Sequence, residues 1–358
     1  MKRVTIKVGS TFFIDDKTGK VATRKILKLC EQIAILKESG VDVCLVTSGA
    51  IAVGVKKMKL KRKPTETNKK QALAAIGQMY LMQVYEQIFD MFNLKCAQIL
   101  LSHDDFGNRG RINNLTTTLN ALLDMGVTPI VNENDAVATS EIKVGDNDTL
   151  SAMTSLAINS SLLVLVSDVD GLFTANPNTC PNAQFIPIVE KIDHSIINLA
   201  KAPSSEFGTG GMATKIKAAQ IATTAGIPMV IINQNQIENL AKVCQGEKIG
   251  TYFCPSEKVE PIKKCWLQFC ANVRGEIVVD QGAKNALENR KSLLSCGVKK
   301  VNGLFNSGDV VNVLDEFGNC IAIGVIAFSN ETLKNIIKQN DNPQLIIHAN
   351  NIVILGEN

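Results

Sequence analysis

Charged, hydroxyl and glycine residues recur in this chain where short apolar runs end. Five such segments are IKVGS at 6–10, VTSGAIAVG at 46–54, NENDAVATSEIKVGDND at 132–148, SDVDGLFTANP at 167–177 and GTGGMATKIKAA at 208–219. Lysines, hydroxyls, carboxylates and a glycine-rich helix start together indicate phosphoryl transfer, because ammonium groups and free backbone amides both bind phosphate.

The common nucleotide-binding motifs are absent from the sequence. There is no GxxxxGK[ST] motif and no strand-linked GxGxxG motif, which argues against P-loop and Rossmann proteins. Asp105-Phe106-Gly107 spells DFG, but neither an HRD loop nor a VAIK lysine accompanies it. We therefore interpret the DFG triplet as a coincidence and not as a protein kinase signature.

Apolar runs typical of buried strands alternate with helical patterns from the N-terminus to about residue 254. Strands are predicted at 3–8, 41–46, 97–101, 127–131, 162–166 and 227–232, and helices at 22–38, 69–92, 112–123, up to 157, and 212–224. This alternation predicts an α/β fold with a mainly parallel sheet sandwiched by helices. Ligands bind such sheets at the carboxyl ends of the strands, where the five polar segments stand.

The alternation of strand and helix patterns ends at about residue 254. We predict an α/β catalytic domain at 1–254, a polar linker at 255–269 and a small β-rich domain at 270–358, where short apolar runs are separated by Gly, Asn and Ser. From residue 265 onward, eight Lys and Arg residues face nine Asp and Glu residues, although the whole chain has a net charge of +4. The tail therefore has no basic surface of the kind that binds RNA tightly.

Composition indicates a globular protein of 358 residues with 45% hydrophobic residues. No apolar stretch is long enough to span a membrane, and the first residues do not resemble a signal peptide, so we expect a cytoplasmic protein. The ten cysteines form no CxxC pair and only three histidines are present. We therefore expect reduced thiols, no zinc site and no redox pair, and the sequence singles out no metal-ligating residue.

With its five segments in this order, the chain resembles the glutamate 5-kinases (γ-glutamyl kinases) of the amino acid kinase family, and its tail looks like the PUA domain that many of them carry. The resemblance implies the amino acid kinase fold and a reaction in which ATP phosphorylates the side-chain carboxylate of L-glutamate to L-glutamyl 5-phosphate, the first step of proline biosynthesis. It also implies feedback inhibition by proline and a homo-oligomer, a dimer or a tetramer.

Residue by residue, the resemblance implies three groups of functional side chains. Lys7 and Lys215 would contact the ATP phosphates from opposite sides and Asp148 would orient both amines. Glutamate would bind to Ser48, Asp135 and Asn147 and to the backbone amides of Gly49 and Ala50. The nucleotide site would comprise Lys7, Gly9, Ser10, Ser167, Asp168, Thr209, Gly210, Gly211, Met212, Ala213, Thr214 and Lys215.

The chemistry agrees with these assignments on independent grounds. A glutamate side chain has a pKa of about 4.3, so it is ionised at neutral pH and needs no general base. The difficulty is the approach of one anion to another, which cationic side chains and Mg²⁺ overcome by neutralising the transferring group. Phe173 and Asn176 depart from the family's usual tyrosine and aspartate, which puts nucleotide affinity and base preference in question.

Several alternatives remain open from the sequence. The residues at 146–148 could form only an Asx turn and a helix N-cap. The basic run at 56–63 is interpreted as a solvated loop, because no aromatic residues interleave with it. Another activity of the same family, aspartate or UMP kinase, is the nearest alternative to glutamate kinase. A non-catalytic amino-acid sensor or RNA-binding protein is the alternative from a different class.

Overall fold

The computed structural model describes residues 2–15, 20–107, 109–137, 147–177, 179–199, 211–269, 271–339 and 342–355. The chain divides into two compact units, which are Met1–Asp105 with Arg109–Val259, and Phe106–Asn108 with Glu260–Asn358. The region predicted as a linker, 255–269, includes helix α10 (Ile262–Phe269) of the second unit. No helix in the described ranges has the length and apolar character needed to cross a membrane.

The first unit is built on an eight-stranded sheet with the order β3-β4-β2-β1-β5-β9-β10-β8. Its strands are β1 (Arg3–Val8), β2 (Asp42–Val46), β3 (Cys96–Leu101), β4 (Thr128–Glu133), β5 (Leu162–Ser167), β8 (Ile188–Val189), β9 (Met229–Asn233) and β10 (Thr251–Phe253). All neighbouring strands run parallel except β9 and β10. Strands β6 (Leu172–Phe173) and β7 (Phe185–Ile186) pair separately.

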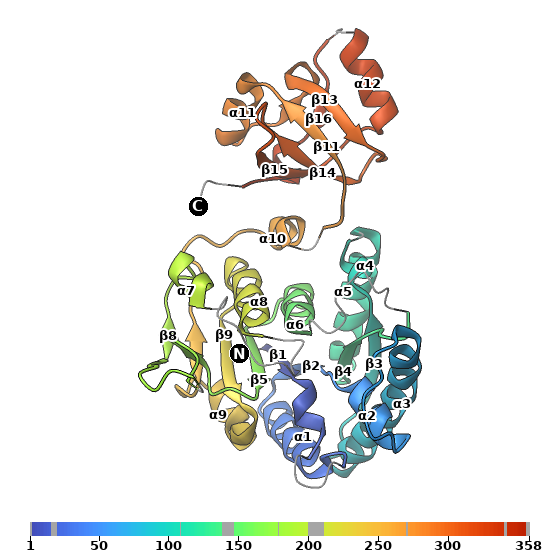
Figure 1. Cartoon of the computed structure of the whole chain (residues 1–358), viewed down its shortest axis with the longest axis vertical. Helices are drawn as coiled ribbons and strands as arrows, with labels where there is room; N and C mark the ends of the chain where they lie inside the picture. Colours follow the sequence, from blue (N-terminus) through green and yellow to red (C-terminus); the bar gives the residue numbers. More distant parts are fainter. Residues whose placement is uncertain are drawn as a thin grey trace. The chain divides into compact units, whose positions relative to one another are not determined.

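Helices cover both faces of this sheet (Figure 1), with α5, α6 and α8 on one face and α1, α2, α3 and α9 on the other. The helices are α1 (Thr23–Glu38), α2 (Ala50–Lys57), α3 (Thr67–Met91), α4 (His103–Gly107), α5 (Arg109–Asp124), α6 (Asn147–Ala157), α7 (His194–Leu199), α8 (Met212–Thr224) and α9 (Leu240–Cys244), with 3₁₀ turns η1 (Ser10–Phe13) and η2 (Gln234–Asn239). The predicted α/β sandwich is confirmed.

Strand β1 separates the two faces residue by residue, because side chains alternate along a strand. Val4, Ile6 and Val8 are fully buried in the core formed with α1, α3 and α9. Thr5 and Lys7 therefore point to the opposite face, where the Thr5 hydroxyl lies 2.7 Å from that of Ser160. Strand parity thus directs the Lys7 amine toward α6 and α8.

Two glycines allow helices α2 and α3 to pack with their backbones in contact. A β-carbon on Gly77 would lie 1.8 Å from the carbonyl oxygen of Ala50, and one on Gly54 would lie 2.0 Å from that of Leu73. Any larger residue at either position would force the two helices apart. This contact fixes the start of α2 against the middle of α3.

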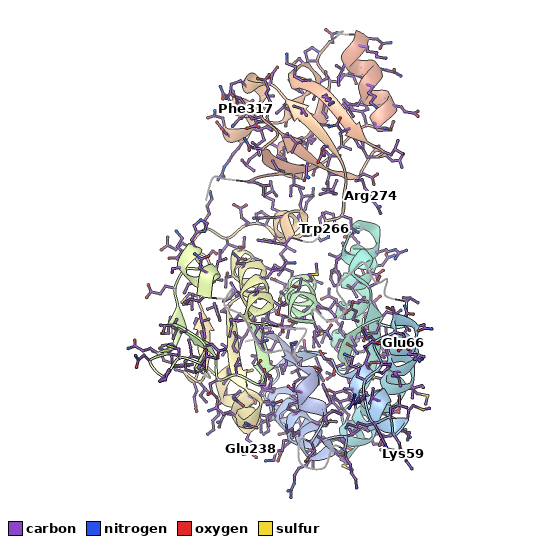
Figure 2. All side chains as sticks on the ribbon, viewed as in Figure 1. Lys59, Glu66, Glu238, Trp266, Arg274 and Phe317 are labelled. Carbon is purple, nitrogen blue, oxygen red and sulfur yellow. The ribbon has the colours of Figure 1, made fainter. Side chains whose placement is uncertain are left out.

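The second unit has a five-stranded sheet with the order β13-β11-β14-β15-β17 and a separate β12-β16 pair. Its strands are β11 (Val273–Val279), β12 (Leu293–Leu294), β13 (Val298–Gly303), β14 (Val310–Leu314), β15 (Cys320–Val325), β16 (Leu345–Ile347) and β17 (Ile352–Ile354). Besides α10 it contains α11 (Gln281–Glu288), α12 (Asn330–Gln339), η3 (Ser295–Gly297) and η4 (Ala349–Asn351). The turn after β14 carries Phe317, which is 86% exposed (Figure 2).

The predicted β-rich character of this unit is confirmed, whereas α11 and α12 are not predicted by the sequence pattern. Each is short, and only Leu287 in α11 and Leu333 in α12 are buried apolar side chains. Both helices are amphipathic, but with eight and ten residues each is too short for its apolar positions to be told apart from those of a short strand.

Candidate active site

Three charged side chains from distant parts of the chain meet at the carboxyl edge of the sheet. Lys7 comes from β1, Asp148 from the first turn of α6 and Lys215 from the first turn of α8. Lys7 Nζ lies 2.6 Å from Asp148 Oδ1, and Lys215 Nζ lies 3.3 Å from Asp148 Oδ2. The carboxylate thus lies between two ammonium groups that are 208 positions apart in the sequence.

This cluster is almost entirely withdrawn from water. Lys7 is 7% exposed, Asp148 1% and Lys215 5%. Burial alone would raise the pKa of Asp148, but the charges of Lys7 and Lys215, with hydrogen bonds from Lys7 and Thr214, hold that pKa well below its usual range. The carboxylate is therefore ionised at neutral pH, and the cluster keeps one net positive charge in a poorly solvated place.

Small residues let ligands approach this cluster closely. A β-carbon on Gly9 would lie 3.8 Å from Lys7 Nζ, and Ser10 follows at the start of η1. Gly49 has φ +87° at the N-cap of α2, a conformation that L side chains rarely adopt, and Ala50 begins the helix. The first amides of α2 have no partner within the helix, so they suit a carboxylate or phosphate.

Polar side chains of a different kind gather beside the start of α2. Asn147 Nδ2 lies 2.8 Å from Ser48 Oγ, 2.8 Å from the carbonyl oxygen of Thr47 and 3.1 Å from Asn132 Oδ1. Asp135 follows β4, and burial raises its pKa to about 6, although the charge of Lys63 acts in the opposite direction. This side of the site offers amide and hydroxyl dipoles and one carboxyl group.

The predicted nucleotide residues lie at the ends of β5 and the start of α8. Ser167 closes β5, and its hydroxyl donates to Asp168 Oδ1 at 3.1 Å. Gly211 is the N-cap of α8, Met212 and Ala213 begin it, and the Thr214 hydroxyl donates to Asp148 Oδ2 at 2.7 Å. The predicted residues Thr209 and Gly210 lie outside the described residues.

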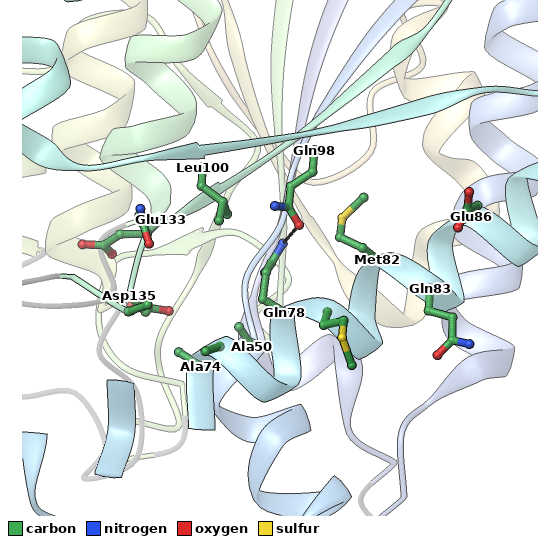
Figure 3. Close-up of a pocket in the computed structure, with 14 residues that line it drawn as sticks. Ala50, Ala74, Gln78, Met82, Gln83, Glu86, Gln98, Leu100, Glu133 and Asp135 are labelled. Carbon is green, nitrogen blue, oxygen red and sulfur yellow. Dashed lines mark hydrogen bonds between the residues drawn. The ribbon is translucent and has the colours of Figure 1, made fainter. Parts of the chain in front are cut away.

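A cavity of about 170 Å³ joins most of the predicted site residues. Its lining includes Lys7, Gly9, Ser10, Ser48, Gly49, Ala50, Asp135, Asn147, Ser167, Asp168 and Lys215. The structure thus brings together predicted residues from all five segments, the fifth being represented in the cavity lining by Lys215. A neighbouring cavity of about 690 Å³ shares Ala50, Glu133 and Asp135 with it and extends along α3 and β3 (Figure 3).

Three residues of this region are not predicted as site residues from the sequence. Lys63, which is predicted to lie in a solvated loop, is exposed and also lines the smaller cavity. Buried Asn132 contacts Asn147, and Gln78 of α3 contacts Asn132. Asn132 opens the polar segment 132–148, which was a signal for it, whereas Gln78 stands within an ordinary amphipathic helix pattern.

The residues that depart from the family pattern lie in a separate small hairpin. The Phe173 ring packs edge-on against Phe185, with ring centroids 5.4 Å apart. The Asn176 carbonyl accepts backbone hydrogen bonds from Thr179 and Cys180. Within the described ranges, no group of three or more His, Cys, Asp or Glu side chains is arranged to hold a metal ion.

Comparison with known proteins identifies the family to which both units of the chain belong. The amino acid kinase family profile matches residues 2–233 and the PUA domain profile matches residues 275–342. The chain is 44% identical over 367 residues to a glutamate 5-kinase of Dictyoglomus turgidum, covering 99% of this chain and 97% of the relative. It is 41% identical over 365 residues to a glutamate 5-kinase of Caldanaerobacter subterraneus, covering 99% and 98%.

The chain is also similar in fold to a solved structure. That structure is a carbamate kinase from Giardia lamblia bound to AMP-PNP, with a TM-score of 0.51, 17% sequence identity, and coverage of 71% of this chain and 99% of that one. At this identity the likeness concerns the fold alone. From the sequence profile and the near full-length relatives, the chain belongs to the amino acid kinase family and, within it, to the glutamate 5-kinases.

Proposed function

We propose that this chain transfers the γ-phosphoryl group of ATP to the side-chain carboxylate of L-glutamate, giving L-glutamyl 5-phosphate and ADP, the first step of proline biosynthesis. The observation that carries the proposal is the convergence of Lys7 and Lys215 on Asp148 at the wall of one cavity. The glutamate 5-kinase relatives, 41–44% identical over nearly their whole length, support the choice of substrate.

The reaction needs charge compensation more than proton transfer. An oxygen of the glutamate carboxylate attacks the γ-phosphorus, a new O–P bond forms, and the bond to the ADP oxygen breaks. Both reactants are anionic, so the two buried amines would stabilise the charge spread over the transferring group. Asp148 would keep these amines together, since two bare ammonium groups would repel each other in a poorly solvated site.

The amino-acid end of glutamate would bind on the polar side of the cavity. The Asp135 carboxylate complements the α-ammonium group by charge, and Ser48 and Asn147 add hydrogen-bonding groups beside it. The free amides at Gly49 and Ala50 suit a carboxylate. This arrangement would orient the side-chain carboxylate toward Lys7 and Lys215.

ATP would occupy the side of the cavity made by the turn after β1, the end of β5 and the start of α8. Gly9 and Ser10 would lie against the phosphates, with Ser167 and Asp168 opposite and the amides at Gly211 to Thr214 binding oxygens. The carboxylate of Asp168 provides the hard oxygen donor that Mg²⁺ prefers. When bound, Mg²⁺ would neutralise phosphate charge and is expected to be held by phosphate oxygens together with Asp168.

Regulation and assembly complete the proposal. Proline carries an α-carboxylate and a ring ammonium but no second carboxylate, so it would occupy the amino-acid end of the cavity and compete with glutamate. We further propose a cytoplasmic homo-oligomer, a dimer or a tetramer, with residues 1–254 as the catalytic domain, 255–269 as the linker and 270–358 as the PUA-like domain.

A coupled ADP-release assay tests the proposed function. We expect turnover with glutamate, dependence on Mg²⁺, and little or no turnover with aspartate, N-acetylglutamate or UMP. Equal or better turnover of another acceptor would refute the choice of substrate. Inhibition by proline is expected to be overcome by raising the glutamate concentration.

A further inference from the structure

A row of side-chain amides connects the surface of the first unit with the candidate substrate site. Gln78 Nε2 donates to Gln98 Oε1 at 3.1 Å, and Gln78 Oε1 accepts from Asn132 Nδ2 at 2.8 Å. Asn132 Oδ1 in turn accepts from Asn147 Nδ2 at 3.1 Å. Figure 3 shows the first link, in which Gln78 of α3 points toward Gln98 of β3.

Two backbone groups show which atom of each asparagine amide is the oxygen and which is the nitrogen. The carbonyl oxygen of Thr47 can only accept, so the Asn147 atom 2.8 Å from it must be the donor Nδ2. The backbone N–H of Glu133 can only donate, so the Asn132 atom 2.9 Å from it must be Oδ1. Asn132 Nδ2 therefore faces Gln78, and the Gln78 atom that accepts its hydrogen bond must be Oε1.

The consequence falls on Asn147, which lines the smaller cavity. Its Nδ2, which carries two hydrogens, lies within hydrogen-bond distance of three acceptors, while its Oδ1 is buried and has no hydrogen-bond partner among the described residues. A buried acceptor without a protein partner is usually satisfied by water or a ligand. Glutamate at neutral pH offers one donor group, the α-ammonium, because both of its carboxylates can only accept.

We propose that Gln78, acting through Asn132, is a positioning residue that keeps Nδ2 of Asn147 turned toward the protein acceptors, so that the unpartnered oxygen is the atom that accepts from the α-ammonium group once substrate binding uncovers it. A reversed amide would present N–H groups and favour a carboxylate there instead. Gln78 is 8% exposed and Asn132 1%, so water replaces these hydrogen bonds poorly when they are removed. The inference rests on the proposed glutamate kinase function and adds how the enzyme selects an amino acid.

The test compares Gln78→Met with two other variants by steady-state kinetics. Methionine keeps the size and helix propensity of glutamine, but its thioether sulfur is only a weak acceptor for the Asn132 amide. We expect the KM for glutamate to rise about tenfold, kcat to fall less than about threefold, and the KM for ATP to stay unchanged. Gln78→Glu restores an acceptor opposite Asn132 and should bring the KM for glutamate back to within about threefold of wild type.

Gln83→Met is the matched control on the same helix. Gln83 is exposed, lines the larger cavity and projects away from Gln98 (Figure 3). This variant should behave like the wild type in every kinetic constant. Thermal unfolding of all three variants is measured alongside. The positioning role would be overturned if Gln78→Met and Gln78→Glu both showed a lower melting temperature and the same increase in the KM for glutamate.

Glutarate, which is glutamate without its ammonium group, gives the sharper readout as an alternative substrate or competitive inhibitor. We expect Gln78→Met to weaken glutamate about tenfold and to leave glutarate unchanged. Equal losses for both ligands would overturn the inference. Failure of the wild type to phosphorylate glutamate would instead refute the proposed function, so the two results are distinguishable.

Discussion

The two sides of the candidate cavity are built on opposite electrostatic principles. On one side Lys7, Asp148 and Lys215 bury three formal charges in contact. On the other side Asn147, Asn132 and Gln78 bury only neutral amides. Truncating one member of a buried ion pair costs about 3–5 kcal/mol, whereas orphaning a neutral buried group costs about 1–3 kcal/mol.

The difference shows where this fold needs charge and where it does not. Phosphoryl transfer redistributes negative charge, so fixed cations are useful only beside the transferring group. Choosing among small amino acids requires direction more than charge, which oriented amides supply. Substitutions on the ionic side should therefore act on kcat, and those on the amide side on KM.

The largest effect is expected from Lys215→Ala. Removing this ammonium group takes away charge compensation in the transition state, and kcat should fall about 10³-fold. Lys7 still neutralises Asp148, so the free energy of unfolding should fall by less than about 3–5 kcal/mol, the cost of leaving a buried charge unpaired. Lys217→Ala, at an exposed position of the same helix, is the matched control. Near-normal kcat in Lys215→Ala would show that the ionic side is structural.

Asp148→Asn should affect stability as well as turnover. The amide cannot neutralise the two buried amines, so the free energy of unfolding should fall by about 3 kcal/mol at pH 7. The pKa of Asp148 is held below its usual range, so its stabilising effect is present above about pH 4 and is lost as the pH falls through the pKa of the folded state. Urea unfolding should show a constant difference between the two proteins from pH 7 to about pH 4 and a difference that narrows as the pH falls below 4. A difference that does not narrow between pH 4 and pH 2 would contradict this account.

Asp135 is the exception on the amide side, because its charge should govern glutamate affinity. Burial raises its pKa to about 6, so below that pH the carboxyl group loses the charge that would bind the ammonium. We expect kcat/KM for glutamate to fall about tenfold for each pH unit below 6, with the KM for ATP flat. A flat profile for glutamate would remove Asp135 from its binding.

The same raised pKa makes a prediction about stability with the opposite sign. A carboxyl group whose pKa is higher in the folded state destabilises folding once it is ionised, from about pH 4 upward and fully above about pH 6. Asp135→Asn should therefore unfold at higher urea concentration than wild type at pH 8 and at similar concentration at pH 3. Reduced stability of this variant at pH 8 would contradict the burial argument.

The smallest expected effect concerns Lys63. Its charge lowers the pKa of Asp135, so Lys63→Met should move the midpoint of the glutamate pH profile upward, by a few tenths of a pH unit, because exposed charges are screened. Lys61→Met, in the same basic run, should leave the midpoint in place. Identical shifts in both variants would point to the general charge of the run and not to Lys63.

The sequence predicts the residues of the ionic side of the site, but only some of those on the amide side. Lys7 interrupts an apolar run before a glycine turn, and Lys215 follows a glycine-rich helix start, so local pattern and resemblance identify both. Gln78 lies 54 positions before Asn132, and nothing in α3 distinguishes it from other polar residues of the helix. Its role depends on how α3 is placed against β4, which is fixed by tertiary packing.

The direct contact between α2 and α3 couples the position of the amide row to the position of the start of α2. Gly77 rests on the carbonyl of Ala50, and Gln78 is the next residue along the chain. The start of α2, whose amides are free to bind a ligand, and Gln78, the first buried residue of the amide row, are therefore held in direct contact. A displacement of either one must move the other, so the two parts of the proposed amino-acid site should move as one rigid body.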